Sequence, residues 1–329
     1  MVFSNFIMQA LQDETVGQEY AVAALTRAVT LSMAGLRRRA DVAAVLVFIG
    51  PPSSGKNHMA RALTRVLTGS EKAMTCINCQ QIEQSDSPRA TGNRPDSGYL
   101  HRQIWFDPAP GFNVVVFEEI DKAPPAFRDD LALAIDRGAI WTPGLAVSFR
   151  NSFVILISEL SRRKADQLVG RTIGFLLDAE TEVEMSRRQA VVLEEVDARL
   201  GQRLVSRIDE IVVFDRLNEQ NIVTLLERQI SAIEAYLSRF YIGFIIEQEA
   251  KTFLLKGGLE DLNHGARQIT RVVRNYLEFP LADLMLSRRL VPGTTAIVRY
   301  DHPRSFLHFE IMTPSLAASP AGRAQAARA

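Results

Sequence analysis

The sequence Gly50-Pro51-Pro52-Ser53-Ser54-Gly55-Lys56-Asn57 follows the apolar run 45–49 and precedes a helical pattern at 59–67. This order of strand, glycine-rich loop and helix is typical of a phosphate-binding loop. The glycines let main-chain N–H groups face phosphate oxygens, the helix N-terminus adds positive potential, and Lys56 is expected to reach the β and γ phosphates. The stretch therefore predicts binding of a nucleoside triphosphate by residues 50–57.

The last residue of this loop departs from the usual pattern. The position after the lysine normally carries Ser or Thr, whose hydroxyl ligates Mg²⁺, and here it is Asn57. Nucleotide binding is thus better supported by the sequence than hydrolysis.

A second apolar run, 114–117, ends in Glu118-Glu119. A continuous run of this kind predicts a strand covered on both faces, which places both carboxylates at the C-terminal edge of the sheet, beside the phosphates. We expect Glu118 to contribute to Mg²⁺ binding, although Asp is usual there, and Glu119 to polarise the attacking water. The alternative interpretation is a strand that ends in two surface glutamates.

The bulk composition predicts a globular protein with a large and a smaller domain. The chain has 329 residues, of which 47% are hydrophobic and 23% charged. Lys and Arg number 38, as do Asp and Glu, so no overall charge attracts nucleic acid or an anionic membrane. No apolar stretch approaches the roughly 20 residues that span a bilayer, and the N-terminus lacks the pattern of a signal segment. We expect a cytoplasmic protein with no nucleic-acid or membrane partner.

The two cysteines, Cys76 and Cys79, have the spacing of a redox pair or of half a zinc site. A structural zinc ion requires four ligands, and the sequence offers no second cysteine pair or nearby His-x-x-x-His. We favour two buried, inert thiols, with a redox role as the alternative.

Strand and helix patterns alternate through the first two thirds of the chain. After a helical segment at 6–37, strands are predicted at 45–49, 73–78, 103–106, 114–117 and 152–158, with helices at 57–67 and 125–136. This alternation predicts an α/β fold in which helices cover both faces of a parallel sheet. A last strand at 208–214 closes the large domain.

The remainder of the chain is mostly helical. Helices are predicted at 222–240, 247–255 and 266–286, and strands at 295–300 and 306–311. The predicted domains are therefore a nucleotide-binding domain over 1–215, a small lid domain over 216–312 and a disordered tail over 313–329.

These features, in this order, resemble the Clp-type AAA+ unfoldases and disaggregases, in particular their C-terminal ATPase ring domain. The segment 16–22, which begins Val16-Gly17-Gln18, resembles the motif beside the adenine. The segment 117–123 resembles the acidic strand end with its lysine, and 206–214 resembles a segment specific to the family. The resemblance implies a P-loop AAA+ fold with a helical lid and ATP and Mg²⁺ as cofactors. It also implies ATP hydrolysis in a homo-hexameric ring that remodels protein substrates.

Two arginines acquire roles from the resemblance. Arg207 matches the arginine that stabilises phosphate charge in a neighbouring subunit, and Arg267, in Gly265-Ala266-Arg267, matches the second sensor, which contacts the nucleotide from the lid. The alternative for both is a solvated arginine at a helix end.

The first sensor departs from the family pattern, because Glu159 stands where the family carries asparagine. A carboxylate there either repels the phosphates or keeps a proton and donates a hydrogen bond. With Asn57, Glu118 and Glu159 all altered, we expect normal nucleotide binding and slow turnover.

Two short segments resemble elements that bind protein partners in the family. Gly98-Tyr99-Leu100 resembles the pore element that grips substrate polypeptide, with a surface tyrosine as the alternative. Ile173-Gly174-Phe175 stands where some family members dock a Clp-type peptidase, with a short packed turn as the alternative.

Two further functions compete with a remodelling ATPase. A hydrolysis-impaired pseudo-ATPase would use bound nucleotide as a regulatory switch. A DNA-directed loader is disfavoured by the zero net charge and by the lack of a recognisable DNA-reading motif.

Overall fold

The computed structural model describes residues 2–36, 42–82, 112–142, 145–159, 192–260, 265–302 and 306–313. The chain divides into two compact units, Met1–Arg216 and Leu217–Ala329, each of which is described by itself. Tyr99, the tripeptide at 173–175, the predicted strand at 103–106 and the tail from 314 lie outside the described residues.

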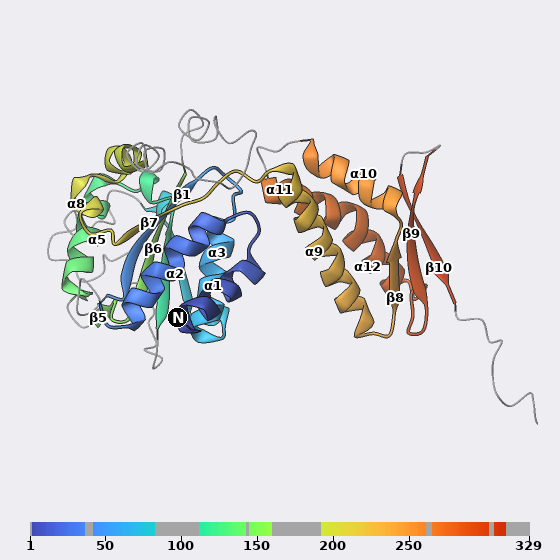
Figure 1. The fold of residues 1–329 in the computed structure, drawn as a ribbon, viewed down its shortest axis with the longest axis horizontal. Coiled ribbons are helices and arrows are strands. Elements are labelled where there is room, and N and C mark those ends of the chain that lie inside the picture. Colours follow the sequence, from blue (N-terminus) through green and yellow to red (C-terminus); the bar gives the residue numbers. More distant parts are fainter. Residues whose placement is uncertain are drawn as a thin grey trace, which may run out of the picture. The chain divides into compact units, whose positions relative to one another are not determined.

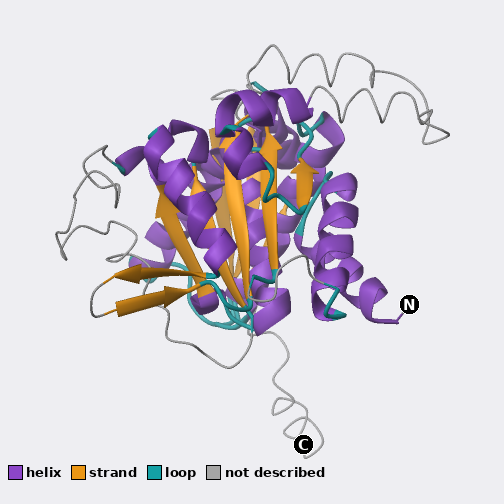
Figure 2. Ribbon diagram, turned by 90° about the vertical axis from the view of Figure 1, so that its left-hand side faces the viewer, coloured by secondary structure: helices purple, strands orange, loops and turns teal. Residues whose placement is uncertain are grey.

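The first unit is built on a five-stranded sheet in the order β2-β3-β6-β1-β7 (Figures 1 and 2). Every neighbouring pair in it is parallel. The strands are β1 (Ala44–Gly50), β2 (Met74–Asn78), β3 (Asn113–Glu118), β6 (Ser152–Glu159) and β7 (Glu210–Val213). Because the carboxyl ends of parallel strands share one edge, the residues that follow β1, β3 and β6 meet there.

Both faces of this sheet are buried. Along β1, Val45, Val47 and Ile49 face one hydrophobic core, whereas Leu46 and Phe48 face the other. This explains why its sequence is a continuous apolar run. The first core is completed by α5 (Pro125–Arg137), the helical residues 192–200 and α8 (Gln202–Val205), and the second by α1 (Val2–Glu14), α2 (Glu19–Met33) and α3 (Lys56–Thr68). The prediction of an α/β sheet covered by helices on both faces is confirmed.

The structure differs from the predicted pattern in two places within this unit. The helical segment predicted at 6–37 is two helices, α1 and α2, separated by a turn with Gly17 at a φ of 66°. The strands β4 (Ala139–Thr142) and β5 (Leu145–Ser148) form an antiparallel pair apart from the main sheet, which the sequence did not predict (Figure 2). Each has only four residues, too few to establish an alternating pattern.

The second unit packs helices against a three-stranded sheet in the order β10-β9-β8 (Figure 1). The helices are α9 (Glu219–Ser238), α10 (Gln248–Leu259), α11 (Gly265–Val273) and α12 (Phe279–Leu286), and the strands are β8 (Gly243–Ile246), β9 (Thr295–Asp301) and β10 (Phe306–Met312). One core joins them. The helix predicted at 266–286 contains a π-helical turn, Arg274–Glu278, which ends two residues before Pro280, a residue with no N–H to donate. None of the described helices is both long and apolar enough to cross a bilayer.

Candidate nucleotide-binding site

The loop after β1 is shaped by two glycines. A Cβ added at Gly50 would lie 2.5 Å from the carbonyl oxygen of Phe214, so only glycine lets β1 pass the end of β7 this closely. Gly55 has a φ of 97° and is the N-cap residue of α3. The chain therefore turns from the central strand directly into a helix whose N-terminus faces the carboxyl edge of the sheet.

Lys56 is the first residue of α3, and it is only 7% exposed. Its Nζ donates to the carbonyl oxygens of Gly50, at 2.9 Å, and Pro51, at 2.7 Å. A buried ammonium needs polar partners, and in this structure the loop's own carbonyls provide them. The lysine is thus held inside the loop, at the place where the sequence predicts phosphates.

A buried hydroxyl in the same loop has no partner within the described residues. It is Oγ of Ser53, a residue whose φ is 59°. An unpaired buried hydroxyl costs free energy, and a phosphate oxygen would satisfy it. Together with the cationic Lys56 and the N-terminus of α3, this makes the loop a good fit for the phosphates of a nucleotide.

Gln18 links the Val16-Gly17-Gln18 segment to the loop and to the end of β7. Its Nε2 donates to the carbonyl oxygens of Ser54 (3.1 Å) and Asp215 (3.0 Å), and its Oε1 accepts from the N–H of Asp215 (3.0 Å). Gln18 is only 4% exposed. The sequence predicts no separate role for Gln18, because its hydrogen-bond partners are remote in the chain. Val16, predicted to lie beside the adenine, is half-buried in the same segment.

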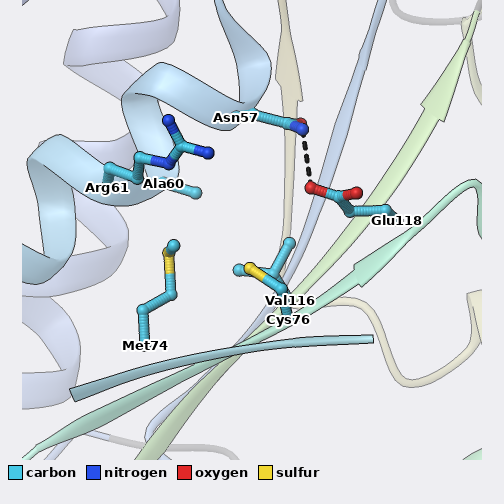
Figure 3. A pocket seen from close by; sticks show the side chains of 7 residues that line it. All are labelled: Asn57, Ala60, Arg61, Met74, Cys76, Val116 and Glu118. Carbon is cyan, nitrogen blue, oxygen red and sulfur yellow. Dashed lines mark hydrogen bonds between the residues drawn. The ribbon is translucent and has the colours of Figure 1, made fainter. Parts of the chain in front are cut away.

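The carboxylates expected to act on Mg²⁺ and water stand at the end of β3. Glu118 accepts a hydrogen bond of 2.6 Å from Nδ2 of Asn57 (Figure 3). Glu119, at a φ of 55°, accepts one of 2.8 Å from Nζ of Lys122. This hydrogen bond raises the pKa of Lys122, and the charges of Glu119, Glu159 and Asp121 raise it further. The structure thus brings the end of the loop and the acidic pair together.

The predicted first sensor, Glu159, is the last residue of β6 and is half-buried. It lies opposite Gly50 in the parallel register of β1 and β6. Its charge also acts on Lys122. Lys122 therefore offsets negative charge at a sheet edge where Glu118, Glu119 and Glu159 gather.

The oxygen atoms around Asn57 and Glu118 suit Mg²⁺ when a nucleotide is present. Among the described residues there is no group of three or more His, Cys, Asp or Glu side chains that could hold a metal ion. Sites for Mg²⁺ in nucleotide-binding proteins use one or two protein side chains together with phosphates and water. Oδ1 of Asn57 and the carboxylate of Glu118 could contribute such oxygens.

Arg207, predicted to act on a neighbouring subunit, is bound within its own chain. Its Nε donates to Oδ1 of Asp136 at 2.8 Å, and its Nη2 binds Oδ2 of the same carboxylate. A further hydrogen bond of 2.9 Å runs from Nη1 to Oγ of Ser206. The Arg207 side chain is 19% exposed, so it is partly buried and reaches the surface. Its action on another subunit stays a prediction.

Arg267, the predicted second sensor, is half-buried on α11 in the second unit. Its contact with a nucleotide also stays a prediction.

The cysteines differ from the expectation of two buried thiols. Cys79 is buried, and burial raises its pKa to about 12, so it is an inert thiol. Cys76 is exposed on the edge strand β2. It borders a shallow hollow whose lining residues are Asn57, Ala60, Arg61, Met74, Cys76, Val116 and Glu118 (Figure 3).

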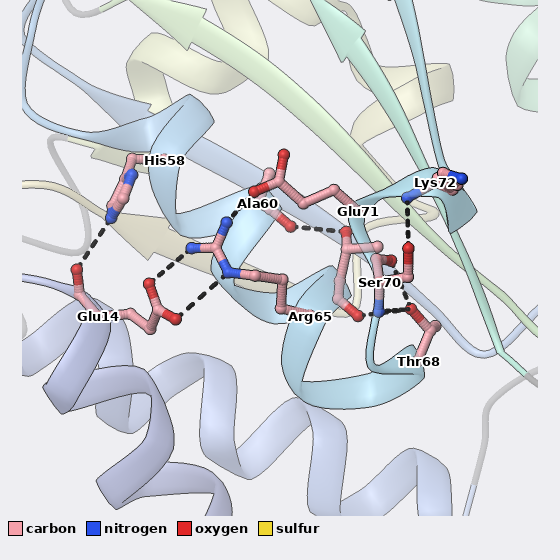
Figure 4. Close-up of polar contacts among 9 residues, drawn as sticks. Glu14, His58, Ala60, Arg65, Thr68, Ser70, Glu71 and Lys72 are labelled. Atoms are coloured by element: carbon pink, nitrogen blue, oxygen red, sulfur yellow. Dashed lines mark hydrogen bonds and ion pairs between the residues drawn. The ribbon is translucent and has the colours of Figure 1, made fainter. Parts of the chain in front are cut away.

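A polar cluster braces α3 against α1. Arg65 donates to Oε1 of Glu14 at 3.2 Å and to Oε2 at 2.6 Å, and it also binds Glu71 (Figure 4). Nε2 of His58 lies 2.9 Å from the carbonyl oxygen of Glu14. The helix that begins at Lys56 is therefore held by the segment that leads to Gln18.

The sheet order and the loop together define a P-loop protein. A model of the AAA domain (Cdc48 subfamily) matches residues 41–211, more than half of the chain, and a model of the C-terminal, D2-small domain of ClpB protein matches residues 217–298. The chain belongs to the AAA+ family, and within it to the Clp type. The predicted resemblance is confirmed.

Curated relatives agree with this assignment. The chain is 30% identical over 310 residues to the chloroplastic chaperone protein ClpD of Arabidopsis thaliana, an alignment that covers 90% of this chain and 32% of that protein. It is 28% identical over 301 residues to chaperone protein ClpB of Pseudomonas putida, which covers 89% of this chain and 33% of that protein. The chain thus spans about a third of the length of these curated relatives.

The fold is also similar to that of the S. cerevisiae Hsp104-ADP complex, with a TM-score of 0.75 and 24% identity. The match covers 92% of this chain and 52% of that one. It supports the fold assignment alone.

Proposed function

We propose that this chain binds ATP between its P-loop and the acidic end of β3, and hydrolyses it slowly to remodel protein substrates as a subunit of a ring. The observation that carries the proposal is the placement of four residues at one edge of the sheet: Lys56, Asn57, Glu118 and Glu119. Nδ2 of Asn57 lies 2.6 Å from Oε1 of Glu118. Membership of the AAA+ family supports the binding of a nucleotide.

The proposed chemistry assigns a role to each side chain. Lys56 exchanges its carbonyl partners for β- and γ-phosphate oxygens. Glu119 holds the attacking water as a general base, and the hydrogen bond from the ammonium of Lys122 orients that carboxylate. Mg²⁺, when bound, neutralises phosphate charge beside Asn57 and Glu118. Arg267 in the same chain and Arg207 of the next subunit add positive charge at the γ-phosphate.

The test has two parts. Binding of a fluorescent ATP analogue should be lost in Lys56→Ala, because the phosphates lose their buried cation. Steady-state phosphate release should be measurable in the parent and absent in Glu119→Gln, which keeps the shape of the side chain without its basicity. Equal binding by the parent and Lys56→Ala would overturn the assignment of the loop.

The second candidate function is a pseudo-ATPase that uses bound nucleotide as a switch. Glu159 favours it, because a third carboxylate at the sheet edge adds negative charge where the γ-phosphate would lie. No phosphate release from the parent at saturating ATP, with binding intact, would support the switch over the enzyme.

Other predictions from the resemblance form part of the proposal. We expect a homo-hexamer, a nucleotide domain over 1–215 with a lid over 216–312 and a tail over 313–329, and Tyr99 on a substrate pore. Docking of a Clp-type peptidase through 173–175 and location in the cytoplasm stay predictions. Size measurement with and without ATP tests the ring, and cross-linking of Tyr99→Cys to an unfolded substrate tests the pore.

A further inference from the structure

The hydrogen bond between Asn57 and Glu118 joins two positions that both depart from the usual pattern. Nδ2 of Asn57, at the start of α3, donates to Oε1 of Glu118, at the end of β3, over 2.6 Å (Figure 3). The donor is a side-chain amide nitrogen and the acceptor is a carboxylate oxygen. The amide nitrogen of Asn57 therefore faces Glu118, and the amide oxygen does not take part in this hydrogen bond.

The two departures are complementary in reach. The amide of asparagine carries its polar atoms one bond further from Cβ than the hydroxyl of Ser or Thr does. Glutamate likewise extends one methylene beyond the usual Asp. Since the two residues face each other between α3 and β3, these extensions bring the polar groups into direct contact.

The amide also separates two roles that a hydroxyl combines on one atom. A hydroxyl oxygen both donates its proton and offers the lone pairs that ligate a cation. In Asn57 the nitrogen donates to Glu118, and Oδ1 remains as an acceptor. The position of the Glu118 carboxylate is therefore set by a protein hydrogen bond and does not require a cation.

The same contact lowers the electrostatic need for a cation. Glu118 stands next to Glu119, at an edge that an ATP molecule would enter with several negative charges of its own. Hydrogen bonding from Asn57 disperses part of the Glu118 charge, while Lys122 does the same for Glu119. Less of the repulsion between carboxylates and phosphates is left for Mg²⁺ to offset.

We propose that Asn57 and Glu118 act as one unit that keeps the site ready for ATP without a divalent cation, so that the affinity for ATP depends little on Mg²⁺. This inference rests on the proposed binding of ATP at the loop. It concerns the affinity for the nucleotide, and it holds whether the bound ATP is hydrolysed or not.

The experiment is a cycle of four proteins: the parent, Asn57→Thr, Glu118→Asp and the double variant. The dissociation constant of a fluorescent ATP analogue is measured for each in Mg²⁺ and in EDTA. For the parent we expect the two constants to agree within about threefold. For the double variant, which has the usual hydroxyl and the shorter acid, we expect EDTA to weaken binding by about tenfold or more.

The two single substitutions report on the pairing. Each breaks the contact from one side, so their effects on the EDTA-to-Mg²⁺ ratio should not multiply to that of the double variant. Met74 lines the same hollow and has no polar group in this contact, so Met74→Leu is the matched control. It should keep the parent's ratio of dissociation constants in EDTA and in Mg²⁺. If a variant fails to fold by circular dichroism, Glu118→Gln replaces it. The carbonyl oxygen of the new side chain still accepts from Asn57, and the parent's ratio is expected.

Three outcomes would overturn the inference: a parent that loses about tenfold or more of its affinity in EDTA, single effects that multiply to the double effect, or a changed ratio in Glu118→Gln. Failure of the underlying ATP-binding proposal is recognised separately, as a parent that binds the analogue in neither buffer, or as binding that survives Lys56→Ala.

Discussion

Arg207 forms a bidentate ion pair with the carboxylate of Asp136. Its Nε donates to Oδ1 at 2.8 Å, and its Nη2 donates to Oδ2. Asp136 stands in the last turn of α5, where the helix dipole disfavours a negative charge, so the guanidinium offsets an unfavourable position. The pair fixes the plane of the guanidinium and leaves its side chain 19% exposed. A trans-acting arginine needs such positioning, because a flexible side chain would lose entropy on reaching a second subunit.

We expect Asp136→Asn to lower steady-state phosphate release by about tenfold while the affinity for ATP stays within about twofold of the parent. The reason is that Arg207 loses its bidentate partner but the loop is untouched. The matched control is Asp129→Asn. Asp129 lies on the same helix as Asp136, α5, and this substitution removes its ion pair with Arg203. If the two substitutions lowered phosphate release equally, the effect would come from the loss of a surface charge on α5 and not from the positioning of Arg207.

Removal of the Gln18 side chain should weaken both the fold and the site. Gln18→Ala removes the buried hydrogen bond to the carbonyl of Ser54 and the two partly buried hydrogen bonds to the carbonyl and the N–H of Asp215. The free energy of unfolding should fall by about 2–3 kcal/mol, and the affinity for ATP should fall as well. Urea denaturation and nucleotide titration check this, with exposed Gln220→Ala as the control. A loss no larger than that of Gln220→Ala would contradict the role of Gln18.

The thiol of Cys79 should make the first unit sensitive to alkaline pH. Burial raises its pKa from 9.0 to about 12, so the folded state keeps the thiol proton that the unfolded chain releases. Its contribution to stability is complete below pH 9 and decreases as the pH rises towards 12, by about 1 kcal/mol at pH 10. Unfolding midpoints of the parent and Cys79→Ala, compared from pH 7 to 10, measure this. Parallel pH profiles would rule it out.

The brace between α1 and α3 should add a small, salt-dependent stability. Glu14→Gln removes the charge that binds Arg65, and because Glu14 is 38% exposed we expect a loss of about 0.2–1 kcal/mol. The loss should shrink at high salt, since exposed charges are screened. Thermal unfolding at two salt concentrations tests this, with exposed Glu234→Gln as the control. A loss that does not change with salt would point to packing instead.

The elements that the sequence predicted well are those buried on both faces. The strands β1 and β3 are continuous apolar runs, and the motifs after them mark the edge of the sheet. The four-residue strands β4, β5 and β8 were missed, although β7, of the same length, was predicted. Four residues carry little pattern, and β8 is defined by pairing with the distant β9. The break at the π-helical turn before Pro280 was also missed, since the helical periodicity continues across it.

At the site, the sequence predicted which residues would gather but not how they would pair. Asn57 and Glu118 are 61 residues apart in the chain, and Arg207 and Asp136 are 71 apart. Each pair of side chains meets only because parallel strands bring their ends to one edge, or because α5 packs beside α8. Spacing in the sequence cannot encode such contacts.

The hydrogen bonds of Gln18 also bear on the synthesis of the chain. They join Gln18 to Asp215, 197 positions later, and the carbonyl oxygen of Phe214 lies close against Gly50 at the start of the loop. When the loop and α3 have emerged from the ribosome, Phe214 and Asp215, which contact the loop and Gln18, have not yet been synthesised. We therefore expect a nascent chain to bind nucleotide only after residue 215 has emerged.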